Sequence, residues 1–144
     1  MSTQDQDRKE ALIRQFFGAL PHAKALGMEV LDVGAGQATF AMAYDPRFIG
    51  DPDTGVIHGG AVSALMDTCC GAAAMSHPDN PGTSATIDLR IDYMRPATPG
   101  QAIRAVAECF HVTRSVAFVR AHAVDGDDAR PVATATGTFT VEAP

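Results

Sequence analysis

Apolar residues recur with two different periods along this chain, and the change of period divides it into elements. Near the N-terminus they recur at helical spacing, which predicts an amphipathic helix over Asp5–Ala19. A short helical turn follows over Pro21–Leu26, and Gly27 can end it in the left-handed region. Residues 1–27 are therefore predicted to form an N-terminal helical segment.

Most of the chain after residue 27 alternates between apolar and polar residues with a period of two, which is typical of β-strands. The clearest case is residues 86–93, where Ile87, Leu89, Ile91 and Tyr93 alternate with Thr86, Asp88, Arg90 and Asp92. The pattern predicts six strands, at residues 28–33, 37–44, 86–93, 103–110, 116–124 and 132–141. Residues 45–57 contain two prolines and two glycines, and we predict a loop there.

Residues 58–75 break this alternation, because nearly all of them are small or apolar. A helix that is apolar on almost every side is expected to be buried on almost every side. One such helix and six strands predict an α+β fold, in which a curved antiparallel sheet wraps around the central helix. Residues 28–144 are expected to form this single domain.

Composition and charge narrow the function classes. The chain has 144 residues, of which 46% are hydrophobic, and a formal net charge of -6, which argues against a nucleic-acid partner. No apolar run is long enough to cross a membrane, and the polar start lacks a secretory signal, so we expect a cytoplasmic protein. The three cysteines have no disulfide-like spacing and are expected to be reduced thiols.

The sequence His58-Gly59-Gly60 begins the predicted central helix. The first N–H groups of a helix have no partner within it, and two glycines leave them unshielded. Such donors can stabilise negative charge that develops on a ligand atom. A glycine-rich junction without a ligand explains the same residues, and spacing alone does not separate the two interpretations.

Asp67 is the only acidic residue between Asp53 and Asp79, and it lies on the same predicted helix. A buried carboxylate is costly unless it is paired or used, so Asp67 is either a structural partner or a working group. His58 and Asp67 are nine residues apart, which is about 13 Å of helical rise. One substrate atom cannot touch both within one chain. A shared reaction would therefore need a twofold interface, and hence a dimer.

The segments GVIHGGAVSALMD and TIDLRIDYMRPA resemble those of the hotdog-fold acyl-CoA thioesterases, in the PaaI-like branch that acts in phenylacetate metabolism. The resemblance implies the hotdog fold, pairing of two subunits into one continuous sheet, and a dimer of dimers. It also implies an acyl-CoA substrate whose acyl group lies in a tunnel at the dimer interface. No metal or redox cofactor is implied, since CoA belongs to the substrate.

The resemblance also assigns roles to residues. The N–H of Gly59 would polarise the thioester carbonyl, and Asp67 of the partner subunit would act as general base on water or as nucleophile. Thr86 would position Asp67 or the water, while His58 would orient the loop or help to polarise the carbonyl. The residues expected to bind the substrate and its CoA portion are Gly60, Tyr93, Arg95, Arg114 and Ser115.

One position departs from the pattern. Relatives carry an asparagine six residues before the motif histidine, and Pro52 stands there in this chain, where it can donate no hydrogen bond. This departure keeps open a non-catalytic module that binds acyl-CoA. A hydratase or dehydratase on the same fold is a further alternative. The choice between aromatic and medium-chain acyl groups stays open.

Overall fold

The N-terminal segment is helical in the computed structural model, which describes residues 1–143. Helix α1 spans Thr3–Ala19 and starts at a capping box in which the Ser2 side chain accepts from the backbone N–H of Asp5. Helix α2, Pro21–Ala25, follows with a proline in its first turn. The predicted helices are confirmed, although α1 begins two residues earlier than the apolar pattern indicated.

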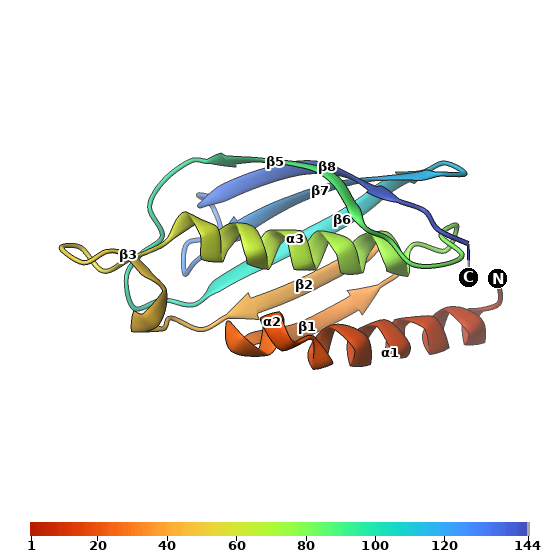
Figure 1. Cartoon of the computed structure of the whole chain (residues 1–144), viewed down its shortest axis with the longest axis horizontal. Coiled ribbons are helices and arrows are strands. Elements are labelled where there is room, and N and C mark those ends of the chain that lie inside the picture. The colour runs from red at the N-terminus through yellow and green to blue at the C-terminus, as the bar shows by residue number, and fades with distance from the viewer. Residues whose placement is uncertain (144) are drawn as a thin grey trace.

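Six strands form one antiparallel sheet in the order β1-β2-β6-β7-β8-β5, which is curved around the central helix (Figure 1). Their bounds are β1 Met28–Gly34, β2 Gln37–Met42, β5 Thr86–Tyr93, β6 Ile103–Val112, β7 Val116–Val124 and β8 Ala133–Thr140. Every neighbouring pair is antiparallel. The six predicted strands are therefore confirmed, with small differences at their ends.

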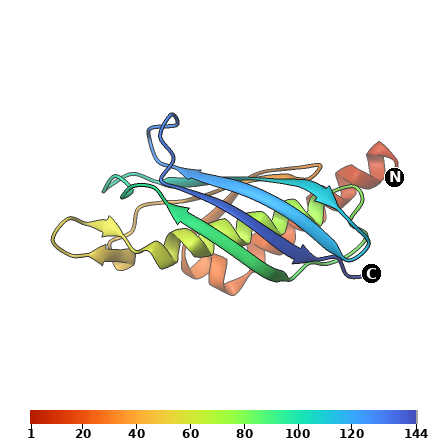
Figure 2. The ribbon, with the colours of Figure 1, turned by 90° about the horizontal axis from the view of Figure 1, so that it is seen from above.

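Helix α3, Gly59–Ser76, contacts every strand of this sheet. Seen from above, the sheet covers the helix along its length (Figure 2). The fully buried side chains of the core come from both layers, among them Phe40, Leu65, Met66 and Phe139. The predicted architecture, a curved antiparallel sheet around one central helix, is confirmed.

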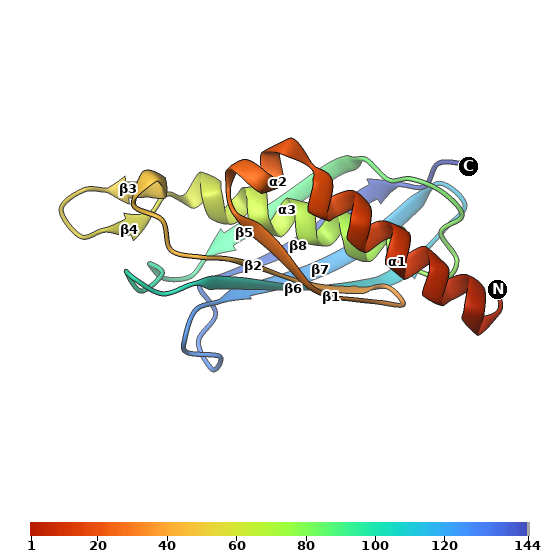
Figure 3. The same cartoon turned by 90° about the horizontal axis from the view of Figure 1, so that it is seen from below.

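Helix α1 packs against β1 and α3 and closes one side of the core (Figure 3). Ile13 and Phe17 are buried, and the Phe17 ring meets the Phe40 ring edge to face at 5.9 Å. By contrast, Leu12 and Phe16, from the same apolar stripe, stay exposed. None of the helices in residues 1–143 has the length and apolar character needed to span a membrane.

The prediction of a loop over residues 45–57 is wrong in part. A short 3-10 helix, Pro46–Phe48, leads into a two-stranded hairpin of β3, Ile49–Asp51, and β4, Val56–Ile57. The apolar ends of these short strands pair across the turn, and Gly55 takes the positive φ of 80° that the turn requires. Prolines and glycines dominate the sequence here and hide the pairing. The hairpin projects from the start of α3 (Figure 1).

The prediction that α3 is buried on nearly all sides is also wrong. One stripe along the helix is only half-buried, namely Ser63, Ala64, Asp67, Thr68 and Gly71. The sheet covers one side of α3 and α1 covers only part of the other, so residues 1–143 leave this stripe partly open. The small side chains of α3 do not predict this partial exposure, because small residues occur both at buried contacts and at exposed positions.

Candidate active site

The start of α3 is held by a histidine cap. The Nδ1 atom of His58 accepts the backbone N–H of Gly60 at 2.7 Å, and the backbone N–H of His58 donates to the carbonyl of Phe48 at 2.8 Å. A side chain at Gly60 would start only 2.8 Å from Nδ1, so the cap requires glycine there. The N–H of Gly60 is therefore used within the protein. Within residues 1–143, the neighbouring N–H of Gly59 has no acceptor and can serve a ligand.

Tyr93, at the end of β5, lies against this helix start. Its hydroxyl donates to the carbonyl oxygen of Gly59 at 2.8 Å. A Cβ atom at Gly59 would be 3.4 Å from the tyrosine ring, so a small residue allows the close approach. A cavity of about 430 Å³ opens beside the pair, and Val62 and Pro96 are among the residues that line it. We refer to it as the Gly59 cavity.

Asp67 lies two turns further along α3 and meets the beginning of β5. The hydroxyl of Thr86 donates to Oδ1 of Asp67 at 2.7 Å, and the carboxylate is half-buried. This hydrogen bond fixes the orientation of the carboxylate. A second cavity, of about 240 Å³, contains the pair, and Gly71 and Phe139 are also part of its wall. We refer to it as the Asp67 cavity.

A β-bulge in β5 allows both Thr86 and Tyr93 to reach α3. Thr86 pairs with Phe139 and Asp88 pairs with Thr138, so Ile87 is an extra residue in the strand. Seven positions separate Thr86 from Tyr93, and strict alternation would point them to opposite faces. The extra residue restores a common face toward α3, and Ile87 is 56% exposed. The simple alternation predicted over residues 86–93 is therefore wrong at Ile87.

The two cavities have no lining residue in common. Gly59 and Tyr93 line one, whereas Asp67 and Thr86 line the other. The structure thus joins the predicted site residues into two pairs at opposite ends of β5. It does not bring Gly59 and Asp67 together within one chain, in agreement with the spacing argument.

Arg95 was predicted to bind the CoA portion, but its guanidinium is fully engaged within the fold. It forms a two-pronged ion pair with Asp125 at 2.8 Å, and its other N–H groups donate to the carbonyls of Pro96 and Arg130. Every donor that arginine possesses is then in use. The contact with Arg95, together with the N–H of Thr98, holds the pKa of Asp125 well below its usual range. This geometry favours a structural role for Arg95.

Arg114 and Ser115 lie in the turn between β6 and β7, at the same end of the molecule as the two termini (Figure 1). The carbonyl of Ser115 accepts the backbone N–H of Val141 at 3.0 Å, which ties the turn to the end of β8. Arg114 is exposed, and it makes no ion pair with any residue in the range 1–143. Its guanidinium is therefore available for a phosphate group.

The cysteines are poor candidates for the chemistry. All three are free and buried. Burial raises the pKa of Cys70 to about 12, with a smaller contribution from the nearby Asp67 carboxylate, and burial also raises the pKa of Cys69. Across the described part of the chain, no group of three metal-ligating side chains could hold an ion.

Sequence reasoning missed the contribution of α1 to this region. Phe16 of α1 and Leu20, which directly follows α1, line the Asp67 cavity, together with Met75 from the end of α3. The apolar stripe of α1 is wider than burial against one surface requires, which is the signal that could have indicated a second contact. On its own, the stripe predicts only the inner face of an amphipathic helix.

Comparison with known proteins identifies the class. Residues 54–132, more than half of the chain, match the family model of the thioesterase superfamily. The chain therefore belongs to the thioesterase superfamily and has its hotdog fold, which confirms the predicted class of enzyme, a thioester hydrolase.

Particular relatives agree with this assignment. The chain is 27% identical to the medium/long-chain acyl-CoA thioesterase YigI of Escherichia coli, over 85% of this chain and 86% of that protein. The crystal structure of a Pseudomonas aeruginosa protein superimposes with a TM-score of 0.80 at 38% identity, covering 91% and 97% of the two chains. A variant of the phenylacetic acid degradation protein PaaI from Thermus thermophilus superimposes with a TM-score of 0.75 at 29% identity, covering 85% and 100%.

Proposed function

We propose that this protein is an acyl-CoA thioesterase that hydrolyses its substrate at the interface of a homodimer, to give a free acid and CoA. The observation that carries the proposal is the separation of the two residue pairs. The unpartnered N–H of Gly59 lies at one end of β5, and the Asp67–Thr86 pair lies at the other. Each chain thus holds two halves of a hydrolytic site that face different cavities.

The edge strand β5 offers a way to join the halves. It is the last strand of the sheet, so one side of its backbone has no strand partner among residues 1–143. If two copies of β5 pair antiparallel about a twofold axis at the strand centre, the first residue lies opposite the last. Thr86 of one subunit would then lie beside Tyr93 of the partner subunit. That pairing would bring Asp67 of one chain close to Gly59 of the partner subunit, twice per dimer.

The chemistry of such a site balances with water as the only co-reactant. Asp67 takes a proton from water, and the oxygen attacks the thioester carbon. The carbonyl electrons move to the oxygen, where the N–H of Gly59 stabilises the negative charge. The C–S bond then breaks, and the CoA sulfur leaves as a thiol after receiving the proton from Asp67. Direct attack by the Asp67 carboxylate is the alternative route.

The CoA portion carries several phosphate charges, whereas the protein has a net charge of -6. Local positive charge is therefore needed, and the free guanidinium of Arg114 is the group we assign to it. The name of one relative, the medium/long-chain acyl-CoA thioesterase YigI, supports an acyl-CoA substrate. The resemblance to the PaaI-like branch also implies an assembly of two dimers, and we include this dimer of dimers in the proposal.

The direct test is thiol release from a panel of CoA esters (acetyl, hexanoyl, palmitoyl, benzoyl and phenylacetyl), with wild type and Asp67→Asn in parallel. We expect turnover by wild type and a loss of about 100- to 10,000-fold in kcat for the variant, the range for removal of a general base. Asp7→Asn, which removes an equal charge from the exposed face of α1, is the matched control and should keep full activity. A blank without substrate corrects for the three cysteines of the protein.

Other results would select the alternatives. A chain that hydrolyses no ester but gains thermal stability from CoA esters would be a binding module, and the turn at Pro52 would be the first place to seek the cause. An altered acyl group without thiol release would indicate a hydratase or dehydratase. Near-full activity in Asp67→Asn would contradict the proposed mechanism.

A further inference from the structure

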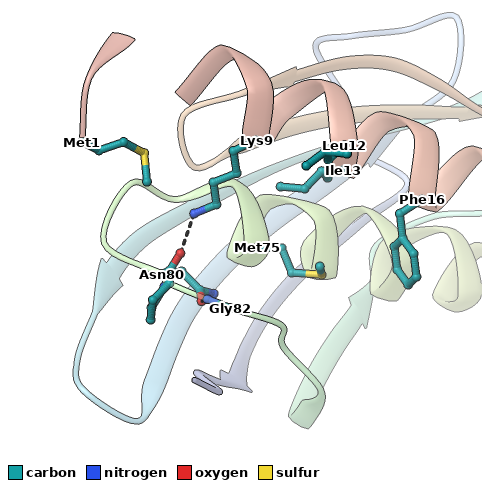
Figure 4. A pocket seen from close by; sticks show the side chains of 9 residues that line it. Met1, Lys9, Leu12, Ile13, Phe16, Met75, Asn80 and Gly82 are labelled. Carbon is teal, nitrogen blue, oxygen red and sulfur yellow. Dashed lines mark hydrogen bonds between the residues drawn. The ribbon is translucent and has the colours of Figure 1, made fainter. Parts of the chain in front are cut away.

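A third cavity adjoins the Asp67 cavity. It has a volume of about 280 Å³ and lies between α1 and the segment that follows α3 (Figure 4). Phe16 and Met75 line both cavities, so the two hollows lie on either side of this pair of side chains. We call the two adjoining cavities together the α1 groove. The Asp67 cavity is the near part of this groove and contains the carboxylate. The third cavity is its far part, which ends near Lys9 and Asn80.

The far part of the α1 groove is built for an apolar occupant. Leu12, Ile13, Phe16, Met75 and Pro81 form most of its wall. Its two polar side chains direct their polar groups into the protein: Nζ of Lys9 donates to the carbonyls of His77, at 2.7 Å, and Asn80, and the Asn80 amide donates to the carbonyl of Ala74 at 2.8 Å.

Lys9 therefore presents its methylene stem, rather than its charge, to the groove. Burial lowers the pKa of the Lys9 ammonium group, which agrees with its withdrawal from water.

The groove also exposes apolar surface that an occupant would cover. Leu12 is 60% exposed and Phe16 is 52% exposed, although the neighbouring large apolar residues of the same helix, Ile13 and Phe17, are buried. The ring of Phe16 is held edge to face against Phe17, with 5.2 Å between centroids. From Asp67 to Met75 the helix advances eight residues, or about 12 Å, a distance on the scale of a medium-length acyl chain.

We propose that the α1 groove binds the distal part of the substrate's acyl chain, and that Phe16 and Met75 are the residues that determine the accepted chain length. This inference rests on the proposed thioesterase function. The thioester lies at Asp67, and the alkyl chain runs past Phe16 and Met75 onto Leu12 and the stem of Lys9. Short acyl groups end before this pair and gain nothing from the far part of the groove.

The test is a chain-length series of straight-chain CoA esters with 4, 8, 12 and 16 carbons, used below their micelle-forming concentrations. For wild type we expect kcat/KM to rise by up to about fourfold for each methylene that becomes buried. Leu12→Asp places a carboxylate in the far part of the groove at an exposed position, where the fold tolerates it. We expect it to lower kcat/KM more than tenfold for the 12-carbon ester and less than twofold for the 4-carbon ester.

Two further variants sharpen the result. Leu31→Asp introduces the same change at a similarly exposed leucine, 45% exposed on β1, which lines neither cavity. It should leave the whole series unchanged. Met75→Trp should fill the junction between the cavities and give the same loss for long esters alone, with an unchanged melting temperature as evidence of folding.

The outcomes separate this inference from the proposed function. If wild type hydrolyses the esters but Leu12→Asp and Leu31→Asp give the same chain-length profile, the acyl chain lies elsewhere and the inference is wrong. If no ester is hydrolysed by any variant, the proposed function itself fails. A change of oligomeric state in Leu12→Asp, with equal loss at every chain length, would instead make the groove a contact between copies of this chain.

Discussion

The two ends of strand β5 carry different chemistry. At its C-terminal end, Tyr93 holds the start of α3, where the Gly59 N–H has no acceptor within the described residues. At its N-terminal end, Thr86 holds the Asp67 carboxylate beside an apolar cavity. One end offers a donor for developing negative charge, and the other offers a group that can take a proton. Neither end alone can hydrolyse a thioester by the proposed route, which is why the comparison points to two chains.

One of the two arginines predicted to bind CoA lies near each end, and the two differ in availability. Arg95, near Tyr93, is saturated by Asp125 and backbone carbonyls. Arg114, in the turn tied to the end of β8, has no ionic partner within residues 1–143. The resemblance to the PaaI-like branch predicts that both bind the CoA portion. Only the fold distinguishes an arginine that holds a loop from one that can meet a phosphate.

After the loss of the Asp67 carboxylate, the next largest expected effect comes from removal of the donor at the Gly59 end. Gly59→Pro deletes the N–H, and proline is acceptable in the first turn of a helix after an extended residue such as His58. We expect kcat to fall by about 100- to 1,000-fold, the range for loss of one oxyanion donor. Gly59→Ala keeps the N–H and adds a Cβ atom at 3.4 Å from Tyr93, so it is the matched control. Equal losses in the two variants would mean that packing, and not the donor, matters there.

At the other end of β5, the hydroxyl of Thr86 positions the carboxylate. Thr86→Val keeps the shape of the side chain but removes the 2.7 Å hydrogen bond to Asp67. We expect kcat to fall by about tenfold, because a positioning contact acts through another group and contributes less than the base itself. Thr86→Ser should restore most of the rate. If the valine and serine variants have the same kcat, the hydroxyl has no part in the reaction.

The contrast between the arginines gives a smaller effect on the rate. Arg114→Ala should raise KM for CoA esters several-fold with little change in kcat, and the difference should be greatest at low ionic strength, where charge contacts are least screened. Steady-state kinetics at two salt concentrations measure it. A lowered kcat with an unchanged KM would contradict a role in binding the CoA portion.

Asp125 should affect stability and its pH dependence rather than the rate. Arg95 holds the pKa of Asp125 below its usual range, so the ionised pair stabilises the native state at neutral pH. This contribution is complete above the unfolded-state pKa of about 3.9 and is lost as the pH falls below it. Asp125→Asn should therefore melt several degrees below wild type at pH 7, with a difference that shrinks below about pH 4. A difference independent of pH would contradict this account.

The elements of the fold follow from local periodicity, because the period of two and the helical period each reflect which face is buried. What the sequence did not reveal depends on distant partners. The bulge at Ile87 arises from pairing with β8, some fifty residues away, and it alone turns Thr86 toward Asp67. The engagement of Arg95 depends on Asp125, and the hairpin before α3 depends on pairing across a turn rich in proline and glycine.

The candidate site was predicted in its residue types and spacing, since a helix fixes the distance between His58 and Asp67 from the sequence alone. The surroundings of Asp67 could not be predicted from the sequence. Its half-buried position and the α1 wall beside it depend on how α1 lies across α3. A wide apolar stripe on an amphipathic helix occurs both where the helix is buried and where it lines an open groove. Only the arrangement of α1 against α3 distinguishes the two cases.

The most direct test of the central claim, a site shared between two chains, is subunit complementation. Asp67→Asn and Gly59→Pro are each inactive by expectation, and they are mixed under conditions that let subunits exchange. A mixed dimer contains one complete site, formed by Gly59 from the first variant and Asp67 from the second. Random exchange therefore predicts recovery of about a quarter of the wild-type rate. Activity that stays at the level of the separate variants, although exchange is verified by mass, would contradict the shared site.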